Sequence, residues 1–280
     1  MNEQYIDELQ QAENEFKQKN YSAAFHIFFE LAHKNCVQAQ YRLAQMYDYS
    51  GNYYIHYSTG SIKENPQQAF YWYQKAAQNG HAFAQHNLAY LYEIGYGVEK
   101  DLTQSIYWYQ KAADNGDNYA QNNLAHSYFN GIGVEKDIQK SIQYWQLSAN
   151  AGNEKAAKHL ACVYLDGEYI KQDIKLGISL LKKSASKGFI DAVLLLGEIY
   201  ENGLYNIPKD EKKSLRLYKQ FIQNEDKFYH SEEVLYRIVK MYIEGCGTEQ
   251  NLKQAKKYLS KISKYSEEYK ELKQLLNEIG

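Results

Sequence analysis

The chain has 280 residues and a formal net charge of −2. This near-neutral balance gives no bulk electrostatic reason to expect a nucleic acid or an anionic membrane as partner. The composition includes 29 Tyr but only 2 Pro, so ring surface is plentiful and helix breakers are rare. We therefore expect an all-α protein that binds no nucleic acid.

The first residues, 1–9, contain neither a basic start nor an apolar run. Neither a secretory signal nor a membrane span is expected, and a cytoplasmic location is predicted.

The three cysteines, Cys36, Cys162 and Cys246, are odd in number and widely spaced, which argues against both a disulfide framework and a structural zinc site. We expect reduced thiols that serve packing, with a reactive thiol as the alternative.

The middle of the chain contains a repeat. Residues 69–77 read AFYWYQKAA and return 36 residues later, at 105–113, as SIYWYQKAA. Residues 95–101 read GYGVEKD and return at 131–137 as GIGVEKD. A fixed period of this length is typical of a solenoid, in which each unit buries its apolar face against its neighbours. We predict one continuous array with repeats at 69–104, 105–140, 141–176, 177–213 and 214–254.

The flanks of this array are less regular. Residues 1–23 are predicted to be a capping helix, 24–68 a first repeat with an insertion at 49–66, and 255–280 the C-terminal capping helices. The extra length of the repeat 214–254 falls around 225–231. A group of lysines crowds the last repeat helix and is interpreted as a solvated cap rather than a site for acidic partners. These are Lys253, Lys256, Lys257, Lys261 and Lys264.

Each repeat reads as two helices with different apolar stripes. The first stripe is Ala69, Trp72, Tyr73, Ala76 and Ala77, and the second is Ala84, Leu88, Ala89 and Tyr92, echoed in later repeats up to Tyr128, Tyr164 and Tyr200. These spacings put each set on one helix face, and the repeated tyrosines are expected to form a core layer. Positive φ is predicted at Gly80, Gly116, Gly152 and Gly188, and Asp101, Asp137 and Asp173 are predicted to begin helices.

These motifs, Ala-x-x-Trp-Tyr-x-Lys-Ala-Ala, Ala-Gln-x-x-Leu-Ala-x-x-Tyr and Gly-x-Gly-Val-x-x-Asp, resemble the Sel-one-like repeat (SLR) family, which is related to the tetratricopeptide repeats. The resemblance implies an all-α, right-handed solenoid of antiparallel helix pairs, with about six repeats and terminal capping helices. It also implies a scaffold or adaptor in protein complexes. Secreted relatives place a cysteine pair in each repeat, and the absence of such pairs here favours an intracellular version.

The resemblance further implies that the second helix of each pair lines a concave groove. Positions outside its apolar stripe vary between repeats, and packing is not expected to require them. In the central repeats they are rings and imidazoles, which suit an extended peptide; unconstrained solvent positions are the alternative. The candidate groove residues are Tyr41, Gln45, Phe83, His86, Tyr90, Tyr119, Asn122, His126, Lys155, Lys158, Cys162, Leu194 and Glu198.

The insertion in the first repeat offers a second candidate surface. Insertions of this kind form loops on one face of a solenoid and often carry function, although a plain surface loop is the alternative. The candidate binding residues of this loop are Tyr49, Tyr53, Tyr54, His56 and Tyr57.

The sequence contains no pattern for catalysis or for a cofactor. His81 and His86 are five residues apart and do not point to one metal ion. The pairs Gly95-x-Gly97 and Gly131-x-Gly133 lack the remaining residues of a phosphate loop, and no nucleophile motif is present. No catalytic residue, cofactor or metal is predicted.

The leading hypothesis is therefore a non-catalytic scaffold that binds a partner protein or an extended peptide in its groove. A second hypothesis is an immunity or inhibitor protein that masks a toxin or an enzyme, using the insertion. A third is a hydrolase-type enzyme that uses His86, His126 and Cys162.

Overall fold

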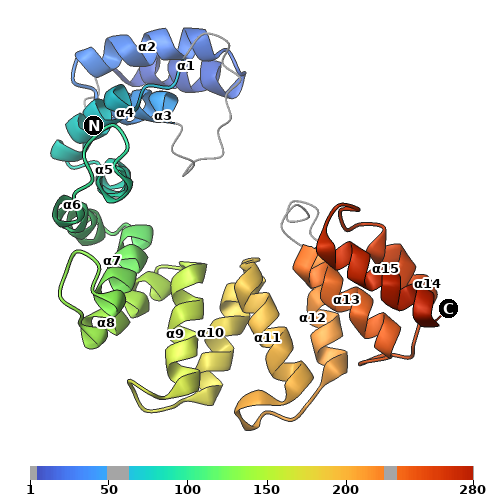
Figure 1. Ribbon diagram of the computed structural model, residues 1–280. Coiled ribbons are helices and arrows are strands. Elements are labelled where there is room, and N and C mark those ends of the chain that lie inside the picture. The colour runs from blue at the N-terminus through green and yellow to red at the C-terminus, as the bar shows by residue number, and fades with distance from the viewer. Residues whose placement is uncertain (1–4, 49–62, 224–231, 280) are drawn as a thin grey trace. The chain divides into compact units, whose positions relative to one another are not determined.

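The structure is a computed structural model that describes residues 5–48, 63–223 and 232–279 (Figure 1). Within these ranges the chain forms helices and no strand, which confirms the predicted all-α class. The helices are α1 (Ile6–Lys17), α2 (Tyr21–His33), α3 (Val37–Tyr47), α4 (Pro66–Gln78), α5 (Ala82–Ile94), α6 (Leu102–Asp114), α7 (Asn118–Asn130), α8 (Ile138–Asn150), α9 (Glu154–Asp166), α10 (Ile174–Ser186), α11 (Ile190–Asn202), η2 (Leu204–Asn206), α12 (Glu211–Ile222), α13 (Glu232–Glu244), α14 (Leu252–Leu259) and α15 (Glu267–Ile279).

Helices of the array alternate between two roles. We call α2, α4, α6, α8, α10, α12 and α14 the first helices, and α3, α5, α7, α9, α11 and α13 the second helices. Neighbours in sequence pack side by side, for example α3 with α4 and α5 with α6. Local sequence therefore determines most of the packing, as a repeat architecture requires.

The apolar stripes bury the residues that their spacing predicts. The buried residues of α4 are Ala69, Trp72, Tyr73, Ala76 and Ala77, which confirms the first stripe. The tyrosine layer is only partly as expected, because Tyr200 is buried whereas Tyr92, Tyr128 and Tyr164 are half-buried. All four occupy the same position near the end of a second helix, and Tyr200 differs because it belongs to a core cluster against which Tyr205 and Ile207, which follow α11, also pack.

Side-chain caps begin most of the first helices, although α2 has none. The Asp101 carboxylate accepts a hydrogen bond from the backbone N–H of Gln104 at 3.0 Å, and Asp137 and Asp173 cap α8 and α10 in the same way. These contacts confirm the predicted helix starts and satisfy donors that the helix itself leaves open. The same position caps α4, α12 and α14 with Asn65, Asp210 and Asn251.

Residues with positive φ join the two helices of each pair from α2 and α3 to α10 and α11. The predicted glycines, Gly80, Gly116, Gly152 and Gly188, have φ between 84° and 98°. Asn35 occupies the equivalent position in the first repeat with φ of 62°, a conformation that asparagine tolerates better than most residues.

The irregular flanks differ in detail from the predicted boundaries. The helix α2 begins at Tyr21, and α4 begins at Pro66, which is the last residue of the predicted insertion. The extra length around 225–231 lies outside the described residues. Since α14 ends at Leu259, Lys261 and Lys264 follow the last repeat helix rather than belong to it.

The chain divides into two compact units, residues 1–148 and 149–280, with the boundary inside α8 and inside the predicted repeat 141–176. In the first unit, α1 to α5 share a core that includes Phe28, Leu43 and Tyr73. In the second unit, α12 to α15 pack around Ile238 and Leu272.

Candidate functional site

Two of the predicted groove residues are packed inside the first unit. Only 7% of Tyr41 and 9% of Gln45 is exposed, so the expectation that packing does not require these positions is wrong for both. Gln45 Nε2 donates a hydrogen bond to the Tyr41 hydroxyl at 3.0 Å. The ring of Tyr41 is covered by His81, which stacks on it at a centroid distance of 4.3 Å.

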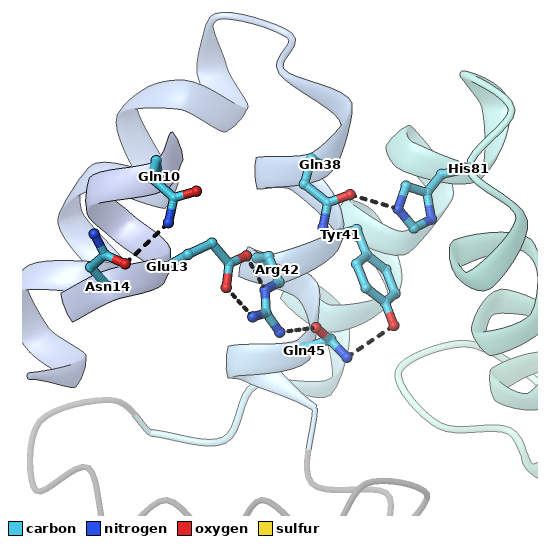
Figure 2. A network of polar contacts seen from close by, with 8 residues as sticks. All are labelled: Gln10, Glu13, Asn14, Gln38, Tyr41, Arg42, Gln45 and His81. Atoms are coloured by element: carbon cyan, nitrogen blue, oxygen red, sulfur yellow. Dashed lines mark hydrogen bonds and ion pairs between the residues drawn. The ribbon is translucent and has the colours of Figure 1, made fainter. Parts of the chain in front are cut away.

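A polar network holds these residues in place (Figure 2). Arg42 lies between Glu13 of α1 and Gln45, donating through Nε to Glu13 Oε1 at 2.6 Å and through Nη1 to Gln45 Oε1 at 3.1 Å. A second contact joins Arg42 Nη2 to the other oxygen of Glu13. A two-pronged pair between arginine and carboxylate fixes geometry as well as charge, so the network anchors the capping helix α1 to α3.

His81 stands at the junction of α3 and α5. Its Nδ1 accepts the backbone N–H of Ala84 at 3.2 Å, and its Nε2 lies 3.1 Å from Gln38 Oε1. These partners require a neutral ring with its proton on Nε2. Burial lowers the pKa of His81, which favours the same state. Phe83, two residues along, is 53% exposed.

The next repeat builds the same arrangement from different residues. His86 of α5 takes the position of Tyr41, and its Nδ1 lies 3.2 Å from Oδ1 of Asp117, which caps α7 as His81 caps α5. Tyr119 takes the position of Phe83, lies 6.3 Å from the His86 ring and is 50% exposed. Two large rings therefore protrude at equivalent positions of neighbouring second helices.

The remaining predicted residues of the first unit lie on the same helix faces. Tyr90 and Asn122 are half-buried and His126 is exposed. On α5, the residues 83, 86 and 90 follow a spacing of three and four, which places them along one face. We call the set Phe83, His86, Tyr90, Tyr119 and His126 the ring row.

Sequence reasoning missed a second repeated feature, the phenol–carboxylate pairs. The Tyr109 hydroxyl donates to Glu93 at 2.8 Å. Equivalent bonds join Tyr73 to Asp48 at 3.0 Å and Tyr218 to Glu201 at 3.3 Å. Burial and the adjacent carboxylate raise the pKa of Tyr73 and Tyr109 well above its usual range, so both phenols stay neutral donors. The recurring order of Asp or Glu directly after Tyr47, Tyr92 and Tyr200 is the sequence signal.

The Sel1 repeat pattern matches residues 37–81, 82–117, 118–153, 155–189, 190–226 and 240–264. The chain belongs to the Sel1 repeat family. Each match in 82–153 begins at the start of a second helix, whereas the predicted repeats begin on first helices, so the two descriptions differ in phase and agree on the period. Sel1 repeat proteins generally mediate interactions between proteins.

Solved structures share this fold. The protective antigen c5321 of uropathogenic Escherichia coli, which displays an SLR fold, is 27% identical with a TM-score of 0.69, and the comparison covers 91% of this chain and 52% of the antigen. This chain thus spans about half the length of that relative. A Sel1 repeat protein from Oxalobacter formigenes is 25% identical with a TM-score of 0.75, covering 97% of this chain and 100% of that one.

The immunity protein Pa5087 from Pseudomonas aeruginosa is 21% identical, with a TM-score of 0.51 and coverage of 87% of this chain and 84% of that one. Identity at this level shows a shared fold alone. No protein with a curated description matches the sequence.

The glutamine of the Sel1 motif Ala-Gln-x-x-Leu-Ala has a structural role. Gln85 Nε2 donates to the carbonyl oxygen of Ala77 at 3.0 Å, at the end of the preceding first helix. Gln40 and Gln121 reach the equivalent carbonyls at 3.2 and 3.3 Å. Each of these carbonyls also accepts the backbone N–H three residues further on, so the glutamine adds a second hydrogen bond at the helix end. The motif is visible in the sequence, but its bonding partner is not.

In the second unit of this Sel1 array the predicted residues form a different surface. Lys155 is exposed, and Lys158, Cys162, Leu194 and Glu198 are half-buried. Leu194 packs partly against the core around Ile238. Burial raises the pKa of the Cys162 thiol, which opposes the thiolate that a nucleophile needs.

Three further observations bear on the predicted chemistry. The loop residues Tyr49, Tyr53, Tyr54, His56 and Tyr57 lie outside the described residues. In the ranges that the structure covers, no three His, Cys, Asp or Glu side chains are grouped so that they could hold a metal ion, and no helix combines the length and hydrophobicity that crossing a membrane requires.

Proposed function

We propose that this Sel1 repeat protein is a non-catalytic scaffold that binds a partner protein or an extended peptide through the ring row. The observation that carries the proposal is the pair of half-exposed rings, Phe83 and Tyr119, at equivalent positions of α5 and α7. Large rings provide contact area at low conformational cost and are enriched where proteins bind one another.

The support beneath these rings strengthens the proposal. Phe83 lies against His81 and Tyr41, and Tyr119 lies against His86. The neighbouring side chains are thereby positioned before a partner arrives, which lowers the ordering cost of binding. His126 and Tyr90 add polar groups that orient a bound chain.

The test uses a matched control on the first helices. Tyr71 of α4 and Tyr107 of α6 are also one repeat apart and are 43% and 50% exposed. Affinity capture from lysate is compared for wild type, Phe83→Ala/Tyr119→Ala and Tyr71→Ala/Tyr107→Ala, with circular dichroism confirming the fold of each. A protein lost only from the Phe83/Tyr119 variant supports the ring row, whereas equal capture by both variants contradicts it.

The two other hypotheses stand differently. An immunity or inhibitor function would use the insertion, and deletion of 49–60 would then abolish neutralisation while leaving helicity intact. The likeness to the Pseudomonas immunity protein bears on the fold and leaves this function a proposal.

The hydrolase hypothesis has little physical support, because a raised thiol pKa at Cys162 disfavours the nucleophilic form. An unchanged phenotype of a His86→Ala/His126→Ala/Cys162→Ala variant would dispose of it.

A further inference from the structure

The first helices of the second unit are strongly basic. Together, α10, α12 and α14 contain ten Lys or Arg residues and one acidic residue, Glu211. The first helices α2, α4 and α6 of the first unit contain only two basic residues, and two acidic residues balance them. Solvation of a first helix therefore does not require an excess of positive charge, and the excess in the second unit needs another explanation.

Three of these lysines occupy one repeated position. Lys175, Lys212 and Lys253 are each the second residue of their helix, and all three are exposed. The same position is neutral in α4, α6 and α8, where the residues are Gln67, Thr103 and Gln139. We call Lys175, Lys212 and Lys253 the lysine ladder.

Helix stability does not explain the lysine ladder. The first turn of a helix carries the positive end of the helix dipole, which favours acidic side chains and disfavours lysine. The caps of α10 and α12 follow this preference, since the carboxylates of Asp173 and Asp210 each accept a backbone N–H at 2.9 Å. The ladder thus places cations where the helices disfavour them, which points to an anion outside the chain.

The packing of the repeats brings the ladder onto one surface. Leu217 of α12 packs in the same core cluster as Leu180 of α10, and Leu215 of α12 shares a second cluster with Ala255 of α14. Packed helices lie about 10 Å apart, so the three ammonium groups follow one another at about that interval. Arg216 and Lys257, each four residues after a ladder lysine, are also exposed and extend the same helix faces.

The acidic residues near the ladder leave this charge in excess. Glu211 pairs with Lys209 at 2.7 Å and accepts the backbone N–H of Gly247 at 3.0 Å. The segment 224–231, outside the described residues, contains two acidic residues, Glu225 and Asp226. These two offset at most two of the ten positive charges, so the face stays basic wherever they lie.

The chemistry of the face favours carboxylates over phosphates. Nine of the ten cations are lysines, whereas arginine is the residue of choice for recognising nucleic acids. Of the large apolar side chains that are exposed, only Leu176 lies on these three helices. The face thus lacks the rings on which bases stack and the apolar side chains that enter a membrane interface. Acidic side chains of a protein are the anions that remain, in line with the general role of Sel1 repeats in protein interactions.

We propose that the lysine ladder binds an acidic, extended segment of a partner protein. An extended chain advances about 3.3 Å per residue, so a carboxylate at every third residue matches the interval of the ladder. The ladder lies in the second unit and does not use the ring row, so this inference goes beyond the proposed function. Lys253 belongs to the lysine group interpreted above as a solvated cap, and its place in the ladder favours the alternative, a site for acidic partners.

The test uses the labelled peptide Ac-Glu-Thr-Ser-Glu-Thr-Ser-Glu-amide and a counterpart in which glutamine replaces each glutamate. Binding to the full chain is measured by fluorescence anisotropy at low salt. Wild type should prefer the glutamate peptide by about tenfold, as three surface charge pairs would give. The variant Lys175→Gln/Lys212→Gln/Lys253→Gln should lose this preference. It should melt no lower than wild type, because it removes cations from the positive ends of three helices.

The matched control is Lys75→Gln/Lys100→Gln/Lys111→Gln, which removes three exposed lysines from the first unit and changes the net charge equally. It should keep the preference, as should Phe83→Ala/Tyr119→Ala in the ring row. Equal binding of the two peptides by wild type, no binding of either, or an equal loss in the lysine control overturns the proposal. A lower melting temperature of the ladder variant assigns these lysines to the fold and overturns it too.

Two further probes separate protein carboxylates from phosphates. Phosphatidylserine vesicles and a DNA duplex are offered to wild type and to the ladder variant under the same conditions. Weaker binding of these probes than of the glutamate peptide is the expected result. Ladder-dependent binding of vesicles or duplex that is tighter than binding of the peptide overturns the proposal and assigns the ladder to a phosphate surface.

Discussion

The Nδ1 atom of His81 accepts the backbone N–H of Ala84 at 3.2 Å, so a neutral imidazole caps α5. The equivalent caps of α7 and α9 are Asp117 and Asn153. Protonation of Nδ1 removes the acceptor and places a proton against the amide. The groups that face this ring, Gln38, Tyr41 and Phe83, carry no charge that would stabilise an imidazolium.

We therefore expect stability to fall in mild acid. Burial lowers the pKa of folded His81 below its ordinary 6.5, so the unfolded chain binds more protons in that range. The contribution of the neutral His81 cap to the free energy of unfolding is fully present above pH 6.5. It is lost as the pH falls from 6.5 toward the pKa of His81 in the folded protein. Urea unfolding of wild type at pH 7.5 and 5.5 should show this loss.

The control is His81→Asn, which keeps a capping acceptor of the kind that Asn153 provides. This variant should lose less stability between the two pH values than wild type. His81→Ala should already be less stable at pH 7.5, by about 1 kcal/mol, because it lacks the cap. An unchanged pH dependence in His81→Asn would contradict the assignment.

Gly97 is expected to be far less replaceable than Gly80. A Cβ at Gly97 would lie 2.0 Å from the carbonyl oxygen of Pro66, whereas a Cβ at Gly80 meets nothing within 4 Å. Both have positive φ, so alanine at either costs about 1–2 kcal/mol of backbone strain. Gly97→Ala should add about 1–3 kcal/mol from the collision. Thermal unfolding of the two variants measures the difference, and equal melting temperatures would contradict it.

The sequence predicts the periodic features of this fold because they depend on local spacing. The stripe of α4, the cap at Asp101 and the turn at Gly80 each follow from residues within one repeat. The burial of Tyr41 could not be predicted in this way, because it depends on His81 in the next repeat and on how Gln45 meets Arg42. A residue outside the apolar stripe can thus be buried by a neighbouring helix that its own helix pattern does not reveal.

The phenol–carboxylate pair of Tyr109 and Glu93 should behave as a coupled unit. Glu93→Leu removes the acceptor of a buried hydroxyl and should cost about 1–3 kcal/mol of unfolding free energy. Adding Tyr109→Phe removes the hydroxyl and makes the pair apolar, as Leu165 and Leu181 are in a later repeat. The double variant should recover about 1 kcal/mol relative to the sum of the single changes. Free energies of unfolding are measured by chemical denaturation. If the changes in the two single variants add up to the change in the double variant, Tyr109 and Glu93 are not coupled.

The hydrogen bonds of the Gln85 amide are expected to stabilise the protein. Its Nε2 donates to the Ala77 carbonyl and its Oε1 accepts from Asn115 Nδ2 at 2.8 Å. Gln85→Met removes both hydrogen bonds, although the Ala77 carbonyl keeps the backbone N–H of Gly80, and it should cost about 1–3 kcal/mol. Where the Sel1 repeat has alanine in place of this glutamine, at Ala157, Lys183 Nζ instead donates to the Ala149 carbonyl at 3.1 Å.

The matched control is Gln78→Met on the exposed face of α4, which should change stability by less than about 0.5 kcal/mol. Lys183→Met should in turn be more costly than replacement of the exposed Lys182, since Lys183 adds a second hydrogen bond to a helix-end carbonyl that also accepts the Gly152 N–H. Urea denaturation followed by circular dichroism measures all four variants. If Gln85→Met and Gln78→Met are equally stable, the backbone N–H of Gly80 alone satisfies the Ala77 carbonyl, and the Gln85 amide does not stabilise the helix end.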